Sequence, residues 1–334
     1  MGARRGAGKG HRGRGVSRNL ITGGTGLVGV YLARQLLADG EEVVLFARRP
    51  ELPRSAADLA GRVEIAGGDV GEWVHVLEAV RRYRVDCVYH SAAVLSAACE
   101  ASAASGFRTN VGGTLNVLEA ARLLDVPSVV FVGSGTTYGL AHIPRHVTDD
   151  TPQRPENMYG TTKLCAEMLG LQYHRQYGVN FRGARYGMIV GPGRRITHHF
   201  GDWSGVIERP AQGLAYTVHS DPDCPCAYIY VKDAVRSLRD LKRSDPSRLR
   251  RRMYNVHGFT ANLLQMAAVV EQHLPGTRIA FEWDRSDAMR IANRSLAYEM
   301  DTTAAKEDFG YIARFALDTM VADFVAEVRA GRAG

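Results

Sequence analysis

The 334-residue sequence has no long hydrophobic run and only five cysteines. No stretch of about 18 consecutive apolar residues occurs, so we expect no membrane-spanning helix. The cysteines do not form a metal-binding framework, because Cys224 and Cys226 are too close for a zinc pair and no second pair accompanies them. We therefore expect no metal. An odd cysteine count without a secretory signal favours a reducing, cytoplasmic location.

Acidic residues are missing from the first 38 positions, and this segment carries much of the net charge of +7. Residues 1–18 hold six arginines and lysines, whereas the remaining chain is close to neutral. A charge confined to a Gly/Arg-rich end indicates a disordered tail over residues 1–17 rather than a nucleic-acid surface. The alternative is an arm that touches RNA or a membrane. We expect neither nucleic acid nor a membrane as a partner.

An apolar content of 45% and a charged content of 23% are typical of a globular protein. In the first half, apolar segments alternate with amphipathic ones, which predicts α/β architecture with a doubly wound parallel sheet. Strands are expected at 19–21, 42–46, 63–66, 87–90, 129–132 and 179–186, and helices at 27–37, 74–83, 107–124 and 159–177. The less regular second half predicts a smaller lobe. We expect a dinucleotide-binding domain at 18–186 and mainly a substrate lobe at 187–330, with chain crossings between them.

The segment Thr22-Gly23-Gly24-Thr25-Gly26-Leu27-Val28-Gly29 joins the first expected strand to the first helix. A pyrophosphate needs backbone N–H groups that no Cβ shields, and it gains from a helix N-terminus. Gly23 would permit the tight turn, Gly26 the close approach of the backbone, and Gly29 the packing of the helix on its strand. This arrangement predicts a Rossmann-type dinucleotide site.

Tyr159 and Lys163 lie four residues apart in an expected helix, so they share one face. A free phenol has a pKa of about 10 and is a poor base at neutral pH. A neighbouring ammonium and an oxidised nicotinamide would both favour the phenolate and lower this pKa. Ser134 follows the apolar segment 129–132, where its hydroxyl could hold the reacting oxygen against the Tyr159 phenol.

With the glycine turn, Ser134 and the Tyr-x-x-x-Lys pair in this order, residues 17–330 resemble the extended short-chain dehydrogenase/reductase family, which includes nucleotide-sugar epimerases and dehydratases. The resemblance implies catalysis by Ser134, Tyr159 and Lys163, and a homodimer formed partly by the helix of Tyr159. It also implies that Ser134, Thr136 and Tyr159 contact substrate. We treat Asp233 as a helix cap.

The expected cofactor contacts combine the glycine turn, the ends of later strands and the catalytic helix. They are Gly23, Thr25, Gly26, Leu27, Val28, Gly29, Arg48, Asp69, Val70, Ala92, Ala93, Asn110, Tyr159, Lys163 and Met188.

Two departures from the family pattern bear on specificity. Ala47 stands where NAD-preferring members carry an acid, and Arg48 could pair with a 2′-phosphate, so we expect NAD(P) with NADP somewhat favoured. Met188 and Cys226 replace an Asn and an Arg that contact the diphosphate of nucleotide sugars. A buried diphosphate without such partners would be poorly solvated. The segment 203–223 instead is similar to the threonine-dehydrogenase-like branch.

The sequence therefore predicts an oxidoreductase that interconverts a secondary alcohol and a ketone on a small, non-nucleotide substrate. The first alternative is a sugar epimerase or dehydratase that retains its cofactor. The second alternative, from another class, is a dinucleotide-sensing binding protein without chemistry.

Overall fold

A seven-stranded parallel sheet forms the centre of the protein, which confirms the predicted fold class. The computed structural model describes residues 16–139, 145–194, 202–284 and 299–333, so almost all of the predicted tail, 1–17, lies outside the described residues. In spatial order the strands are β11 (Met253–Val256), β7 (Phe181–Tyr186), β5 (Ser128–Val132), β4 (Cys87–His90), β1 (Arg18–Thr22), β2 (Glu42–Ala47) and β3 (Glu64–Gly67).

The strand order reverses between β1 and β4, because successive strands are added first on one side of β1 and then on the other. Strands β2 and β3 follow on one side of β1, and β4, β5, β7 and β11 on the other. Thr22, the last residue of β1, is paired with both Phe46 and His90. The loops that follow these strands consequently meet at one edge of the sheet. Ligands of open parallel sheets bind at such a reversal, beyond the carboxyl ends of the strands.

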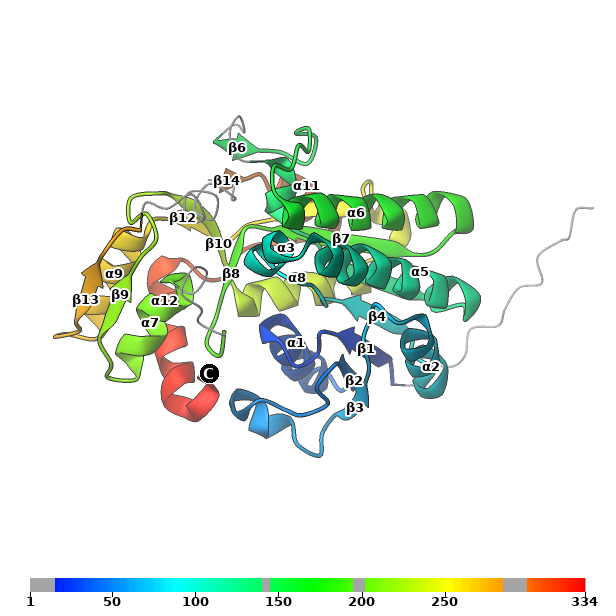
Figure 1. Ribbon diagram of the computed structural model, residues 1–334, viewed down its shortest axis with the longest axis horizontal. Helices are drawn as coiled ribbons and strands as arrows, with labels where there is room; N and C mark the ends of the chain where they lie inside the picture. Colours follow the sequence, from blue (N-terminus) through cyan, green and yellow to red (C-terminus); the bar gives the residue numbers. More distant parts are fainter. Residues whose placement is uncertain (1–15, 140–144, 195–201, 285–298, 334) are drawn as a thin grey trace, which may run out of the picture.

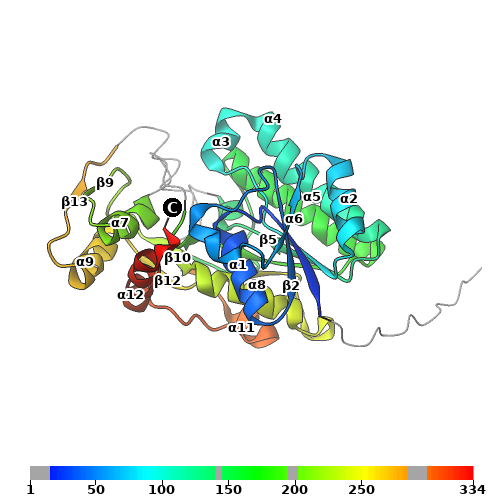
Figure 2. The same cartoon turned by 90° about the horizontal axis from the view of Figure 1, so that it is seen from below.

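Helices cover both faces of this sheet (Figures 1 and 2). α1 (Leu27–Ala38) and α8 (Val231–Arg243) lie on one face, and α2 (Trp73–Tyr83), α5 (Gly113–Leu123) and α6 (Met158–Tyr177) on the other. Successive strand residues point to opposite faces, so Ile21 joins the α1/α8 core while Leu20 joins the other. Two buried faces explain why strands such as β2 and β5 are mostly apolar.

A smaller lobe lies beside the sheet, at the left of Figure 1. Its strands are β8 (Met188–Val190), β10 (Cys226–Tyr230) and β12 (Phe259–Ala261) in one sheet, and β9 (Tyr216–Val218) with β13 (Ile279–Phe281) in another. Its helices are α7 (Asp202–Ala211), α9 (Leu263–His273) and α12 (Leu317–Glu327). Between β10 and β12 the chain returns to the large sheet to form α8 and β11, so the two parts are linked by several crossings.

Several short elements were not predicted by the sequence pattern. They are α3 (Ser96–Ala101), α4 (Ala103–Gly106), α11 (Thr303–Phe309), and the strand pair β6 (His146–Val147) with β14 (Glu299–Met300). The helix expected at 107–124 is formed by a π-helical turn, η2 (Phe107–Gly112), followed by α5. In the part of the chain that the structure describes, we find no helix both long and apolar enough to cross a membrane.

The prediction that Asp233 caps a helix is wrong. The N-cap position of α8 is Tyr230, and Asp233 lies buried in the first turn. Its carboxylate accepts from Arg236 Nη2 at 2.6 Å and from the backbone N–H of Arg314 at 2.8 Å. Asp233 thus ties α8 to the segment that precedes α12, a long-range contact that no local pattern reveals.

Candidate active site

The glycine turn after β1 has the shape that a dinucleotide cradle needs. Gly23 has φ +68°, and a Cβ built on it would lie 2.9 Å from Ala92 Cα. A Cβ on Gly29 would lie 2.6 Å from the carbonyl oxygen of Gly23, so only glycine lets α1 pack on this turn. By contrast, among the described residues other than its chain neighbours, a Cβ on Gly26 would meet one atom within 4 Å, the Gly23 oxygen at 3.2 Å. The backbone at Gly26 is therefore open to a ligand.

The N-terminus of α1 adds an electrostatic reason for anion binding at the same place. Its N-cap is Gly26, which has no side chain to accept from the first turn, and no acidic residue lies in that turn. The first N–H groups of a helix have no partner within the helix. They and the helix dipole would hold a pyrophosphate here, so the predicted contacts at Thr25, Leu27 and Val28 fit a dinucleotide.

A buried polar chain holds the loop after β4 against this turn. The Thr22 hydroxyl contacts His90 Nδ1 at 2.7 Å, and His90 Nε2 contacts the Thr114 hydroxyl at 2.9 Å. Burial lowers the pKa of His90 to about 3, so the ring is neutral. Thr22 Oγ1 also accepts from the N–H groups of Ser91 and Ala92 at 3.2 Å. The backbone of predicted contacts Ala92 and Ala93 is thus held beside Gly23.

Asn110 holds the far end of the same loop. Its Oδ1 accepts from the Val94 N–H at 2.7 Å, and its Nδ2 donates to Val94 O at 3.0 Å and to the Thr162 hydroxyl at 2.9 Å. Because Thr162 lies in α6 between Tyr159 and Lys163, Asn110 couples the loop after β4 to the helix that carries these two residues.

Ser134, Thr136 and Tyr159 meet at the carboxyl end of β5. Ser134 is the N-cap of the 3-10 turn η3 (Gly135–Tyr138), and its hydroxyl lies 2.8 Å from the Thr136 hydroxyl. A Cβ on Gly160 would lie 2.6 Å from the Thr136 carbonyl oxygen, so glycine at this position lets the first turn of α6 approach η3. The Asn157 side chain caps α6 by accepting from the Gly160 N–H at 2.7 Å. These contacts bring the Tyr159 phenol to the Ser134 hydroxyl.

The surroundings of Tyr159 act on its pKa in opposite directions. Burial raises the pKa to about 12, while hydrogen bonding by the Ser134 side chain and the charge of Arg194 lower it. The chain by itself therefore does not produce the lowered pKa that the sequence argument anticipated. The sequence argument invoked two charges that stabilise the phenolate, the Lys163 ammonium and the oxidised nicotinamide. The second of these is present only when the cofactor is bound.

Lys163 lies one turn after Tyr159 and is almost fully buried, with 4% of its surface exposed. Its ammonium donates to Val132 O at 2.6 Å and lies 4.2 Å from the centre of the Phe131 ring. Burial lowers the pKa of Lys163 to about 7, and Glu167 opposes that shift. No effect of Lys163 on the Tyr159 pKa is found, so its support of the phenolate stays a prediction.

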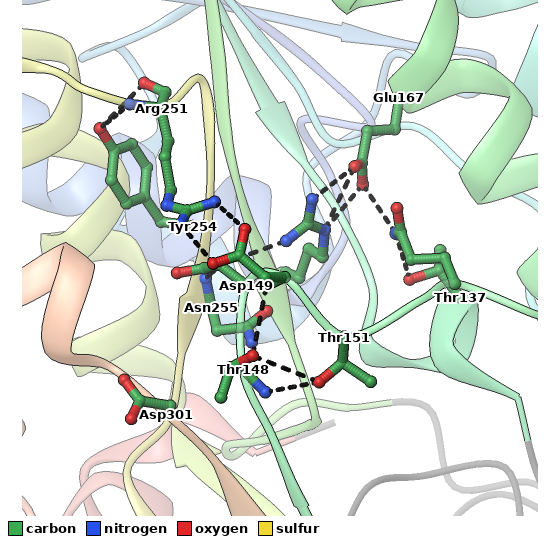
Figure 3. Close-up of polar contacts among 12 residues, drawn as sticks. Thr137, Thr148, Asp149, Thr151, Glu167, Arg251, Tyr254, Asn255 and Asp301 are labelled. Atoms are coloured by element: carbon green, nitrogen blue, oxygen red, sulfur yellow. Dashed lines mark hydrogen bonds and ion pairs between the residues drawn. The ribbon is translucent and has the colours of Figure 1, made fainter. Parts of the chain in front are cut away.

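A polar network behind the site braces α6 and η3 (Figure 3). Buried Arg185, on β7, donates through Nη2 to Glu167 at 2.6 Å and through Nη1 to Asp149 at 3.2 Å. Gln153 donates to the Thr137 hydroxyl at 2.8 Å and to Glu167 at 3.4 Å. The Thr137 hydroxyl in turn donates to Ser134 O at 2.9 Å. The sequence argument missed this network, because its members come from distant segments.

The predicted contacts at the adenosine end lie beyond β2 and β3. Arg48 is exposed directly after β2, with no ion pair to any described residue. Asp69 accepts from the Gly71 N–H at 2.9 Å and from Arg108 Nη2 at 3.2 Å, and Val70 is buried against Gly113. Met188, on β8, is buried and pairs with Tyr228. The roles of these residues in cofactor binding stay predictions.

The sequence argument also missed Arg194, whose charge lowers the pKa of Tyr159. It follows β8 through Gly191-Pro192-Gly193, a segment that the sequence pattern showed only as irregular. The signal that could have found it is a cation directly after a Gly-Pro-Gly turn in the segment flanking the nicotinamide.

Comparison with known proteins agrees with this geometry. The sequence profile of the NAD dependent epimerase/dehydratase family matches residues 19–256. D-erythronate dehydrogenase from Cupriavidus necator is 32% identical over 286 residues, which cover 80% of this chain and 85% of the relative. Mitochondrial L-threonine 3-dehydrogenase from Sus scrofa is 29% identical over 311 residues, which cover 91% of this chain and 80% of the relative.

A solved structure is similar over nearly the whole chain. The holo form of a GalE-like L-threonine dehydrogenase from Cupriavidus necator has a TM-score of 0.85 and 25% identity, covering 93% of this chain and 99% of that one. The chain belongs to the NAD-dependent epimerase/dehydratase family, and within it is an oxidoreductase of the threonine-dehydrogenase-like branch.

Proposed function

We propose that Tyr159 is the general acid/base in the interconversion of a secondary alcohol and a ketone on a small, non-nucleotide substrate. The observation that carries this proposal is the meeting of the Tyr159 phenol with the Ser134 hydroxyl, one helical turn from a buried lysine and at the same edge of the sheet as the glycine turn. Among the described residues near this point, the phenol is the group best suited to take a proton from a substrate hydroxyl.

Each residue has a distinct part in this mechanism. The nicotinamide, when bound, accepts or supplies the hydride. Ser134, held by Thr136 and by its capping position, donates to or accepts from the substrate oxygen and keeps it against the phenol. Tyr159 takes the hydroxyl proton during oxidation and returns it during reduction. Lys163 holds α6 against β5 through Val132 and would hydrogen-bond the nicotinamide ribose.

The substrate class is supported by the relatives and by the lobe after β7. The relatives named above act on L-threonine and D-erythronate, both small hydroxy compounds. Met188 and Cys226 are buried, and neither side chain carries a charge that could bind a diphosphate. A small substrate is consistent with both observations.

The test is turnover by purified protein with a panel of small secondary alcohols and ketones. We expect net NAD(P)H formation or consumption, and Tyr159→Phe should lower kcat by about 100-fold or more. Tightly bound dinucleotide without net turnover would favour the epimerase alternative. Dinucleotide binding with unchanged function in Tyr159→Phe would favour the sensing protein.

We further propose a preference for NADP. Ala47 ends β2 without a carboxylate, and exposed Arg48 and Arg49 have no ion-pair partner among the described residues. Arg48→Ala should raise KM for NADP about tenfold and leave KM for NAD nearly unchanged, whereas Ala47→Asp should shift preference toward NAD. A tenfold wild-type preference for NAD would refute the proposal.

Three broader proposals complete the assignment. We propose a homodimer, because α5 and α6 pack together and expose Leu115, Leu123, Met168 and Tyr177. We propose that residues 187–330 mainly bind substrate. We also propose a cytoplasmic location, which the five free cysteines, three of them buried, support.

A further inference from the structure

Three segments that are far apart in the sequence meet near the start of α1. They are the turn at Gly193 after β8, the 3-10 segment η1 (Arg54–Leu59) after β2, and the π-helical turn η5 (Val328–Arg332) that continues α12. A Cβ on Gly193 would lie 3.2 Å from Arg332 O and 3.2 Å from Ser55 Cβ. Figures 1 and 2 show η5, in red, beside the blue segment that contains α1 and η1. The smaller lobe therefore contacts the loop after β2 at this point.

This contact lies beside the dinucleotide site. Two residues before Gly193, a Cβ on Gly191 would lie 3.3 Å from Leu27 Cδ1, and Leu27 is the first residue of α1. Ser55 lies in η1, which follows the carboxyl end of β2, and ligands of such sheets bind at this edge. The three segments thus border the place where the N-terminus of α1 would hold the pyrophosphate.

One carboxylate fastens η5 to the helices that cover the large sheet. Glu327, the last residue of α12, accepts from Arg332 Nη1 at 2.6 Å and from Lys232 Nζ at 2.9 Å. It also accepts from the hydroxyl of Tyr31 at 3.1 Å. Burial acts to raise the pKa of Glu327, but hydrogen bonds from Arg332 and Lys232 hold it below its usual value. Because Tyr31 lies on α1 and Lys232 on α8, ionised Glu327 connects η5 to both helices.

Arg34, on α1, fastens η1 from the other side. It donates through Nη2 to Ser55 O at 2.5 Å and to Asp58 Oδ1 at 2.7 Å, and through Nε to Asp58 Oδ2 at 2.9 Å. Hydrogen bonding by Arg34 holds the pKa of Asp58 below its usual range, and the charge of Arg332 acts in the same direction. Partly exposed ion pairs of this kind are individually weak, so we expect the contact to open without unfolding either part.

We propose that η1, Gly193 and η5 form a clasp that opens when NAD(P) enters or leaves, and that its ion pairs set the rate of cofactor exchange. While the clasp is closed, the smaller lobe cannot move away from the loop after β2, and both border the dinucleotide site. Opening breaks contacts of Ser55, Gly193 and Arg332 but none within the glycine turn. The clasp should therefore slow entry and exit alike and leave Kd nearly unchanged.

The first test measures association and dissociation of NAD(P)H by stopped-flow fluorescence. Arg332→Ala removes the ion pair with Glu327, so both rate constants should rise about fivefold while Kd changes by less than about twofold. Arg329→Ala is the matched control, because Arg329 lies in η5 but is exposed and has no ion pair to a described residue. Its rate constants should equal those of the wild type.

Two outcomes of this test would overturn the inference. If Arg332→Ala and Arg329→Ala behaved alike, the ion pair would not control exchange. If only the dissociation rate constant rose, Arg332 would bind the cofactor directly, and no clasp would be needed to explain the change.

The second test locks the clasp with a disulfide. In Ser55→Cys/Gly193→Cys the two Cβ atoms would lie 3.2 Å apart, close to the separation of about 3.5–4.5 Å in disulfides. Once oxidised glutathione has formed this bond, as checked by mass spectrometry, NAD(P)H exchange should nearly stop. Dithiothreitol should restore it in the same protein. Ser55→Cys alone, oxidised in the same way, controls for the five native cysteines. Equal exchange by the bonded and reduced forms would refute the clasp.

The clasp requires only a dinucleotide site, so its failure is distinguishable from that of the proposed function. Binding with the expected exchange rates, but without turnover of any alcohol or ketone, would keep the clasp and refute the reaction. Tyr159-dependent turnover, with exchange rates that neither Arg332→Ala nor the disulfide alters, would keep the reaction and refute the clasp.

Discussion

Burial raises the pKa of Tyr159, and Ser134 is one of two groups among the described residues that lower it. Removing the Ser134 hydroxyl should therefore raise the pKa of the phenol. A hydrogen bond to a charged group contributes about 1.5–3 kcal/mol, which corresponds to about one to two pH units. The rising limb of the pH–kcat profile for alcohol oxidation should move to higher pH by this amount in Ser134→Ala. A lower kcat with an unmoved limb would mean that Ser134 only positions substrate.

Lys163 is a buried amine whose charged form is unfavourable in the folded protein. Its pKa is lowered to about 7 in the folded protein, against about 10.4 in an unfolded chain. Between these values the unfolded chain binds more protons, so the free energy of unfolding should rise with pH. Relative to Lys163→Met, the wild type should gain about 2 kcal/mol between pH 7 and 9. Urea unfolding of both proteins across this pH range measures the difference in their free energies of unfolding. A difference that does not change with pH would contradict the burial argument.

At the scale of the elements, the turn from β1 into α1 depends on close backbone contacts. Gly29→Ala would force a Cβ to within 2.6 Å of the backbone of Gly23 and Gly24. We expect it to lower stability by about 1–3 kcal/mol and to weaken NAD(P) binding by more than about tenfold, because the cradle must open.

Gly112→Ala is the matched control for that substitution. Gly112 has helical dihedral angles, and the nearest atom to its added Cβ is Phe107 O at 3.9 Å. This variant should bind NAD(P) normally and gain up to about 1 kcal/mol. If both variants behaved alike, the packing argument for Gly29 would fail. Thermal unfolding and fluorescence titration with NAD(P)H provide the measurements.

The whole molecule presents an apolar surface on α5 and α6, where Leu115 is 41% and Met168 42% exposed. Burying two such side chains in a dimer stabilises it by about 1.5–3 kcal/mol each. The double variant Leu115→Glu/Met168→Glu should therefore weaken dimerisation by more than about 100-fold in analytical ultracentrifugation. Leu264→Glu, on α9, where Leu264 is 40% exposed, is the control. A wild type that sediments as a monomer would refute the homodimer.

Local patterns in the sequence determined the order of strands and helices, because strand and helix periodicity is set by each segment's own side chains. The expected strand at 87–90 and the expected helix at 159–177 agree with β4 and α6 to within a residue. The glycine turn and the Tyr-x-x-x-Lys pair were readable for the same reason, since each motif lies within one short segment.

Only the tertiary structure decided which distant groups meet. The network of Arg185, Glu167 and Asp149 joins three separated segments, and Asp233 contacts a segment about 80 residues further along the chain. The raised pKa of Tyr159 likewise follows from burial, which only folding produces. Local residue order specifies which chemical groups the chain carries, whereas desolvation and proximity, which set their charge and their partners, arise from the packed molecule.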